Sequence, residues 1–297
     1  EQGNTLVTID VLGATITENT FAGTTTRFAS SLRVRGSSTT VQNNIFDSSN
    51  LGEFCSHASF GNGSALTGAA MDVDDLEGVL LNNTFDRAAG FDFTITPNIQ
   101  GAIEEAPADV EVLVLPDTLA LKGQIVIDEN RSVRGLGATK SDVVFRPNQN
   151  TGSSGDAQGW FLVNSGIEFN MNNLTLDGTG YLIYQAIRHQ GSGTFDNVHF
   201  TTIQFNESGP NYQGVGVAAF GTGNVDVRNS MFDNIGRIGV LYYGTGITGS
   251  TFSNNTYIGK GTGDFLDYAL DIGAGANVTA TGNTISGNKG SASSDGS

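Results

Sequence analysis

The sequence is poor in cysteine, histidine, proline and long apolar runs, and each shortage excludes a class of protein. Cys55 is the only cysteine among 297 residues, so no internal disulfide can form, and with three histidines it cannot build a good zinc site. The five prolines suit a chain whose interior strands must donate every backbone N–H. No apolar run approaches the roughly 18 residues of a membrane span, so we expect no membrane insertion.

Basic residues are also scarce, because 14 Lys and Arg face 30 Asp and Glu, for a net charge of −16. Such a surface argues against nucleic acid and anionic membranes as partners. Binding of a polyanionic polysaccharide would need a local basic groove or Ca²⁺. The plain interpretation of this charge is a secreted protein, extracellular or on the cell surface.

What the chain does contain is a recurring phrase. An apolar strand former and a spacer lead to a polar pair ending in Asn, and an apolar residue follows two positions later. The clearest copies are TITENTF, TVQNNIF, VLLNNTF and VDVRNSMF, and the position of the Asn is held by Asn19, Asn44, Asn83, Asn173, Asn197, Asn229, Ser250 and Asn283. Self-similarity at about 20–50 residues marks stacked repeats, and the alternation inside each copy makes the unit a set of strands.

Stacked coils of strands would lie about 4.8 Å apart and align their apolar residues in internal columns. Asn at one place in successive coils can pass side-chain hydrogen bonds up the stack, because its amide both donates and accepts. We therefore expect Asn19, Asn44, Asn83, Asn173, Asn197, Asn229 and Asn283 to form a structural ladder. The alternative is an all-β sandwich in which these asparagines are ordinary turn residues.

With these copies and one further segment, the chain resembles the right-handed parallel β-helix, or pectate-lyase-like, superfamily. The segment is residues 97–145, PNIQGAIEEAPADVEVLVLPDTLALKGQIVIDENRSVRGLGATKSDVVF, which looks like the usual opening of such helices. The resemblance implies an all-β solenoid with a short amphipathic capping helix near residues 98–108. It implies no particular reaction, since the superfamily holds lyases, hydrolases, epimerases, tailspikes and adhesins.

The position of the cap-like helix suggests how the chain is divided. We expect uncapped β-helix coils over 1–96, a β-helix starting with the cap over 97–290, and a flexible tail over 291–297. Residues 1–96 could form their own stack, be the tail of an earlier repeat, or pack beyond residue 290. Because neither end shows a capping segment, the chain could bind copies of itself head to tail and build a filament.

Catalytic signatures of related enzymes are missing. We find no N-T-D, H-G or R-I-K motifs, no D-P-H, and no second Arg after Arg146-Pro147. The best local group is Tyr181, Tyr184, Arg188 and His189, with Asp177 just before and His199 a coil later. Strand alternation puts Arg188 and His189 on opposite faces, so both cannot meet one substrate.

Other polar groups are weaker candidates. Residues 70–83 read as strand, turn and strand, with Asp74 and Asp75 exposed in the turn. Together with Asp72 and Glu77 they could bind Ca²⁺ if a corner gathered them. We assign no catalytic residue, no metal site and no cofactor from the sequence.

Two functions remain open. The first, which we favour here, is a non-catalytic structural surface or filament subunit, supported by the missing signatures and the uncapped ends. The second is a carbohydrate-active enzyme, a polysaccharide lyase or glycosidase, working in a groove on the coil exterior. The expected partner is therefore another copy of the chain in the first case and a polysaccharide in the second.

Overall fold

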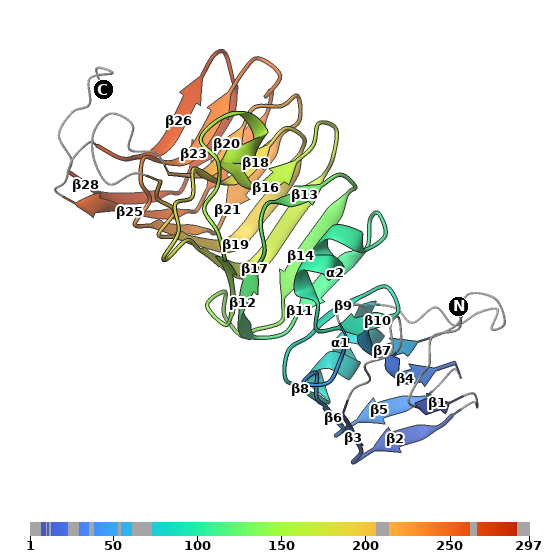
Figure 1. Cartoon of the computed structure of the whole chain (residues 1–297). Coiled ribbons are helices and arrows are strands. Elements are labelled where there is room, and N and C mark those ends of the chain that lie inside the picture. The colour runs from blue at the N-terminus through green and yellow to red at the C-terminus, as the bar shows by residue number, and fades with distance from the viewer. Residues whose placement is uncertain are drawn as a thin grey trace. The chain divides into compact units, whose positions relative to one another are not determined.

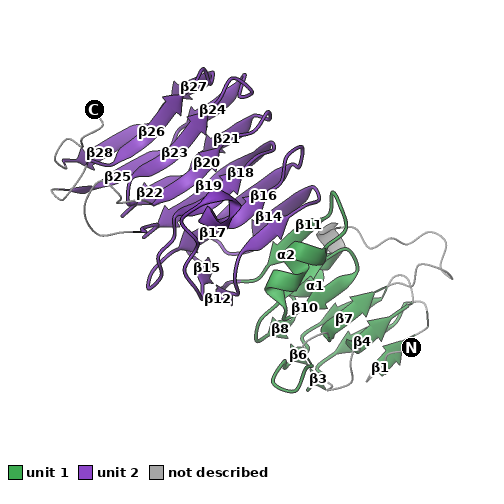
Figure 2. Cartoon of the chain, turned by 45° about the horizontal axis from the view of Figure 1, so that its top comes forward, with its two compact units in different colours: residues 1–115 green, residues 116–297 purple. Residues whose placement is uncertain are grey.

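The computed structural model describes residues 7–9, 11, 13–22, 30–35, 39–52, 55–60, 73–205, 214–261 and 266–289. The chain forms two compact units, residues 1–115 and 116–297, coloured separately in Figure 2. The division suggested by the sequence, between residues 96 and 97, stays a prediction of where one stack of coils ends and the next begins. No described helix is long and apolar enough to cross a membrane.

Unit 2 is a right-handed parallel β-helix, as the sequence indicated, and its strands stack in three faces. The strands of face 1 lie side by side along the unit in Figure 1. They are β13 (Ile125–Ile127), β16 (Gly159–Val163), β18 (Gln185–His189), β20 (Val215–Ala219), β23 (Ile238–Tyr243) and β26 (Tyr268–Gly273). Face 2 comprises β14 (Arg131–Gly135), the first half of β17 (Phe169–Asp177), the first half of β19 (Gly193–Thr201), β21 (Val225–Arg228), β24 (Ser250–Ser253) and β27 (Val278–Thr281).

Face 3 contains β12 (Asp117–Leu121), β15 (Val143–Pro147), the second halves of β17 and β19, β22 (Met231–Asp233), β25 (Thr256–Gly261) and β28 (Thr284–Asn288). The short 3₁₀ helix η1 (Gly155–Gln158) lies in the loop before face 1. Parallel pairing in register keeps each residue beside its equivalent in the next coil. A side chain that points outward therefore has outward neighbours on both sides.

Alternation along each strand separates the core from the outer surface. On face 2 the inward column is Val133, Met171, Phe195, Val227 and Phe252, each at most 1% exposed. Burying each such side chain contributes about 1.5–3 kcal/mol. The residues between them point outward and are polar, which is why one strand can serve both core and surface.

Unit 1 begins with short parallel stacks. Its strands are β1 (Val7–Ile9), β2 (Thr15–Thr17), β3 (Thr20–Phe21), β4 (Ser30–Val34), β5 (Thr40–Gln42), β6 (Ile45–Phe46), β7 (Ser56–Phe60), β8 (Thr84–Phe85), β9 (Ala89–Phe91), β10 (Thr94–Thr96) and β11 (Glu111–Val114). The parallel sets are β1–β4–β7, β2–β5 and β3–β6–β8. After β7 the pairing becomes antiparallel, through β10, β9 and β11.

The recurring phrase forms a continuous aromatic and amide stack in unit 1. Phe21, Phe46 and Phe85 stack with ring centroids 4.7 Å apart. Two residues earlier, the Oδ1 of Asn44 accepts hydrogen bonds from the backbone N and Nδ2 of Asn19 at 3.0 and 3.1 Å. The Oδ1 of Asn83 accepts the same pair from Asn44, both at 2.9 Å.

In unit 2 the expected ladder asparagines occupy two different positions. Asn283 lies at the inner position, but Asn173, Asn197 and Asn229 lie one residue earlier, with φ between 52° and 56°. The inner position is held by Leu174, Val198, Ser230, Asn255 and Asn283. The reason for the difference is that Asn suits both places, since it tolerates left-handed backbone at the corner and also pairs amides inside.

The inner ladder of unit 2 therefore depends on a residue that the sequence pattern did not single out. The backbone N of Ser230 donates to the Oδ1 of Asn255, and the backbone N of Asn255 donates to the Oδ1 of Asn283, both at 2.9 Å. Ser250, counted among the copies, lies elsewhere on β24, where its Oγ accepts from the backbone N of Val225.

Two α-helices lie among the described residues, both in unit 1. The expected cap helix is α2 (Ile99–Glu105), whose N-cap Asn98 accepts a hydrogen bond from the backbone N of Gly101 at 3.0 Å. The interpretation of residues 70–83 as strand, turn and strand was wrong, because Val73–Leu81 form α1. Buried Leu76, Val79 and Leu80 recur with helical spacing, not in alternation.

Candidate functional site

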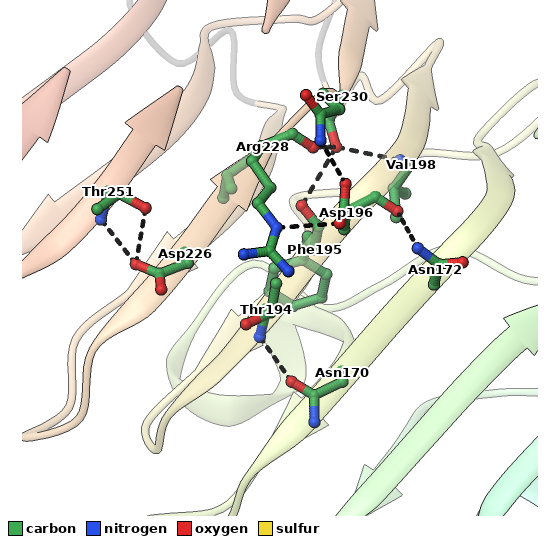
Figure 3. Close-up of polar contacts among 12 residues, drawn as sticks. Asn170, Asn172, Thr194, Phe195, Asp196, Val198, Asp226, Arg228, Ser230 and Thr251 are labelled. Carbon is green, nitrogen blue, oxygen red and sulfur yellow. Dashed lines mark hydrogen bonds and ion pairs between the residues drawn. The ribbon is translucent and has the colours of Figure 1, made fainter. Parts of the chain in front are cut away.

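The outward side chains of face 2 form a polar network in which they hydrogen-bond to one another. Figure 3 shows Arg228 directed at Asp196 and Thr251 directed at Asp226. The Nε of Arg228 donates to the Oδ2 of Asp196 at 3.0 Å, and Thr251 donates to the Oδ1 of Asp226 through both its backbone N and its Oγ1. These carboxylates are occupied by neighbours in adjacent coils, so face 2 supports the stack and offers little free chemistry.

Face 3 carries a different set of outward groups, which we call the His199 site. It consists of Arg146, Thr175, Asp177, His199, Thr201 and Asp233 from β15, β17, β19 and β22, with Lys140 from the loop over residues 136–142. In register, Thr175 lies beside His199, and Asp177, Thr201 and Asp233 follow one another in consecutive coils. The set thus spans neighbouring coils on one outer side of unit 2, where Thr175 and Asp177 are buried and His199 and Asp233 are partly exposed.

His199 and Asp233 form the centre of this site. The Nε2 of His199 lies 3.0 Å from the Oδ2 of Asp233, and the two side chains are 17% and 28% exposed. The hydrogen bond from His199 is the main reason that the pKa of Asp233 is held below its ordinary value. An ionised Asp233 accepts a hydrogen bond from the Nε2–H of His199, which orients the ring and leaves Nδ1 as the nitrogen able to accept a proton.

Lys140 reaches across the coil that carries His199. Its backbone O accepts a hydrogen bond from the Oγ1 of Thr175 at 2.8 Å, in the coil before His199. Its Nζ approaches the backbone O of Asn229 at 3.4 Å, in the coil after. Burial lowers the pKa of the Lys140 ammonium. The loop is further held by Asn173, whose Nδ2 donates to the backbone O of Gly135 and of Gly137.

A second cation, Arg146, lies on the same face. Its Nε and Nη2 both approach the Oδ2 of Asp177 at 2.8 Å, and its side chain is 49% exposed. Burial would raise the pKa of Asp177, but hydrogen bonds from Thr179 and Arg146 outweigh burial and hold that pKa below its ordinary value. An ionised Asp177 fixes the arginine while leaving Nη1 for a ligand.

The structure separates the residues that the sequence grouped together. His189 points into the core with no exposed surface, as alternation required, whereas Arg188 points outward on face 1 and pairs with Asp156 at 2.9 Å. Tyr181 lies in the loop after β17, where it is 37% exposed. Of the group, only Asp177 and His199 belong to the His199 site.

Lys140 and Asp233 were missed as functional candidates. No motif signals them, because they come from different coils: Asp233 meets His199 through the parallel register, and Lys140 through a loop that bonds Thr175 and Asn229. The available signal is positional: Asp233 follows the corner residue Asn229 by four residues and falls on the outward side of β22.

The possible calcium site cannot be assembled from the described residues. Asp72 lies outside them, Asp74 and Asp75 lie on α1, and no group of three or more His, Cys, Asp or Glu side chains in the described part of the chain is placed to hold a metal ion.

Comparison with known proteins gives a likeness of fold. No protein-family model and no curated protein matches the chain. Among solved structures it is similar to a PL6 family alginate lyase, AlyGC, with 10% identity and a TM-score of 0.34, covering 94% of this chain and 58% of that one. An arginine-to-alanine mutant of the same lyase matches with a TM-score of 0.33 and 10% identity, covering 93% and 58% of the two chains. The chain thus spans less than two thirds of the length of these structures.

This comparison corrects the leading expectation from the sequence. The non-catalytic surface or filament subunit is contradicted, since the solved structures found by the comparison are described as alginate lyases. At 10% identity and a TM-score of 0.34 the likeness assigns no activity to this chain, so the case for a particular chemistry rests on the residues of the His199 site.

Proposed function

We propose that the chain is a carbohydrate-active enzyme, a polysaccharide lyase, that acts on a uronate polymer at the His199 site. The observation that carries this proposal is the oriented His199–Asp233 pair. Lys140 extends across the coil of His199, and Arg146 lies on the same face. A chain with a net charge of −16 gathers two of its 14 Lys and Arg here. These are the groups that β-elimination of a uronate needs, a base and cations to stabilise the carboxylate.

The reaction would proceed by removal of the proton on the carbon next to the uronate carboxylate. His199 accepts that proton at Nδ1 while Asp233 stabilises the resulting imidazolium. Lys140 stabilises the negative charge that develops on the carboxylate. The bond from the adjacent carbon to the glycosidic oxygen breaks, a carbon–carbon double bond forms, and the leaving oxygen takes a proton from solvent water.

Arg146 suits a different sugar unit of the same polymer. It is separated from the coil of His199 by the coil of Asp177, and two coil spacings correspond to about 10 Å. Its guanidinium is bound to Asp177 in the coil before His199, whereas the Nζ of Lys140 lies at the backbone O of Asn229 in the coil after, so the two cations suit different carboxylates. We assign it to the carboxylate of a neighbouring uronate, where it fixes the register of the chain.

The test is a screen of uronate polymers for unsaturated products, which absorb ultraviolet light. With the polymer that reacts, His199→Gln should lower kcat by about 10²–10⁴-fold, the usual contribution of a general base. Asp233→Asn should also lower kcat, because the ring loses its orienting carboxylate. Arg228→Ala is the matched control, since Arg228 forms a similar ion pair with Asp196 on face 2 and should leave the rate unchanged.

Two results would overturn the proposal. One is full activity in His199→Gln, which would remove the assigned base. The other is new reducing ends without unsaturated product, which would favour the glycosidase alternative. We also propose an extracellular or cell-surface location, which the acidic charge and a polymeric substrate support.

A further inference from the structure

Two columns of outward side chains run along face 3 and pass through the His199 site. In the first column, His199 lies between Thr175 and Met231 of the coils before and after. The second column, two residues further along each strand, contains Arg146, Asp177, Thr201, Asp233 and Ile258 in consecutive coils. Consecutive coils lie about 4.8 Å apart, which is close to the length of one sugar unit in an extended polysaccharide. A polymer lying along these columns therefore meets one coil with each sugar.

The sign of the charge alternates from coil to coil along the second column. Arg146 supplies a cation in one coil, and the next coil holds Asp177, whose Oδ2 accepts from Arg146 at 2.8 Å. The following coil holds the uncharged Thr201, and Lys140 extends its ammonium across that coil. The coil after it holds Asp233. Places for a carboxylate of the polymer therefore alternate with coils that carry a carboxylate of the protein.

The two cations of this surface are balanced by two carboxylates. The hydrogen bonds that Asp177 and Asp233 accept outweigh burial and hold the pKa of each carboxyl below its ordinary value, so both are ionised. A polymer with a carboxylate at every coil would place some of its charges beside these two groups, where like charges repel. In a chain with a net charge of −16, no general positive field offsets that repulsion.

Past Asp233 the surface becomes apolar and uncharged. Met231 follows His199 in the first column and is partly exposed, and Ile258 follows Asp233 in the second and is 42% exposed. The described outward residues of both columns in the last two coils are Thr256, Ile258, Thr284 and Ser286. Apolar side chains suit the C–H-rich face of a neutral sugar, or the methyl group of a deoxy sugar, and give a carboxylate no partner.

The end of β25 carries one cation, Lys260, two residues after Ile258. Its Nζ donates to the backbone O of Gly236 at 2.7 Å, in the segment between β22 and β23. The ammonium thus lies at the edge of face 3 that leads to face 1. A sugar bound over Met231 and Ile258 is held by apolar contact and not by this charge.

We infer that the substrate is an alternating polymer, in which each uronate is followed by a neutral sugar. This inference rests on the lyase proposed for the His199 site, and it names the class of polymer that this lyase takes. Uronates occupy the coils of Arg146 and His199, which are two sugar units apart. Neutral sugars occupy the coil of Asp177 between them and the apolar surface of Met231 and Ile258.

The test compares two kinds of polymer in the assay for unsaturated product. Polygalacturonate and alginate carry a carboxylate on every sugar, whereas in hyaluronan, unsulfated chondroitin and the rhamnogalacturonan backbone uronates alternate with neutral sugars. We expect kcat/KM for at least one alternating polymer to exceed that for both homopolymers by about tenfold or more, because a homopolymer sets carboxylates against Asp177 and Asp233.

Binding is measured separately with His199→Gln, in which the base is absent and the polymers stay intact. Tighter binding of an alternating polymer, with no unsaturated product from the unaltered chain, would refute the lyase and support the inference. Equal or better binding or cleavage of a homopolymer would refute the inference and leave the lyase standing. Failure to bind any of the five polymers would overturn both.

Ile258→Lys tests the apolar surface directly, since the residue is exposed and the variant should fold normally. The added cation should raise kcat/KM for a homopolymer relative to an alternating polymer by about tenfold. Val126→Lys is the matched control, because Val126 points outward on β13 of face 1 and is 37% exposed. The control should leave that ratio unchanged. The same ratio in Ile258→Lys as in the unaltered chain would contradict a neutral sugar at this place.

Discussion

Asn255 shows what one buried amide contributes to a stacked coil. The residue is 1% exposed, and its side chain accepts from the backbone N of Ser230 and donates to the backbone O of Val227. Asn255→Ala would leave both backbone groups buried without these partners. We expect a loss of roughly 3 kcal/mol in the free energy of unfolding, measured by urea denaturation.

Asn172→Ala is the comparison for this prediction. Asn172 points outward on face 2 and donates one hydrogen bond, to the backbone O of Asp196 at 3.2 Å. Its removal should cost under about 1 kcal/mol. Equal losses in the two variants would contradict a special role for the inner ladder.

His189 makes the stability of unit 2 dependent on pH. Burial lowers its pKa from 6.5 to about 4, because the charged ring would lie in the core beside Phe195. Between these values the unfolded chain binds a proton that the native chain does not, so stability falls as the pH drops from 6.5 to 4. The full difference corresponds to roughly 3 kcal/mol.

The measurement is urea unfolding of the unaltered chain and of His189→Gln at several pH values. His57 is also buried with a lowered pKa, so both proteins should keep some acid sensitivity. The variant should lose the share that belongs to His189. The same slope between pH 6.5 and 4 in both proteins would rule out His189 as a contributor.

At the scale of elements, the corner between faces 2 and 3 shows which features of the coils the sequence could predict and which it could not. The repeated phrase located the corners and the stacked strands, because period-2 alternation and Asn at a turn are strong local signals. It could not separate Asn173 from Leu174 as the inner residue, since that depends on register between coils. The helix α1 was missed for a related reason, as a ladder phrase overlaps its last turn.

The corner backbone itself gives a testable difference between substitutions. Asn197 has φ of 56°, and its Nδ2 donates to the Oδ1 of Asn173 at 2.9 Å. Asn197→Ala should cost about 1–2 kcal/mol more than Asn197→Gly, because only glycine adopts this backbone without strain. Thermal unfolding of both variants would check this, and a more stable alanine variant would refute the left-handed corner.

At the scale of the whole molecule, the fold was predictable and the His199 site was not. The stack follows from repetition, which a single sequence displays openly. The site brings Lys140, His199 and Asp233 together from separate coils, and their spacing in the sequence carries no motif. The parallel pairing of β19 and β22 reveals that His199 and Asp233 share a face, and the hydrogen bonds of Lys140 to Thr175 and Asn229 place its side chain across the same coil.

The net charge of the chain also acts on the molecule as a whole. With 30 acidic and 14 basic residues, carboxylates repel one another over the surface, and this repulsion opposes the compact state. Raising the salt from about 10 mM to about 150 mM shortens the screening length from about 30 Å to about 8 Å. The Tm should therefore rise by several degrees in calorimetry at pH 7.

The rise should shrink when carboxylates are protonated, because repulsion between them then disappears. Repeating the series at a pH near the ordinary pKa of Asp and Glu, about 4, separates this effect from general salt stabilisation. Ion pairs such as Arg228–Asp196 act in the opposite direction, since salt weakens them, but exposed pairs contribute only about 0–1 kcal/mol each. A Tm that falls with salt at pH 7 would mean that such pairs outweigh the repulsion among the excess acids.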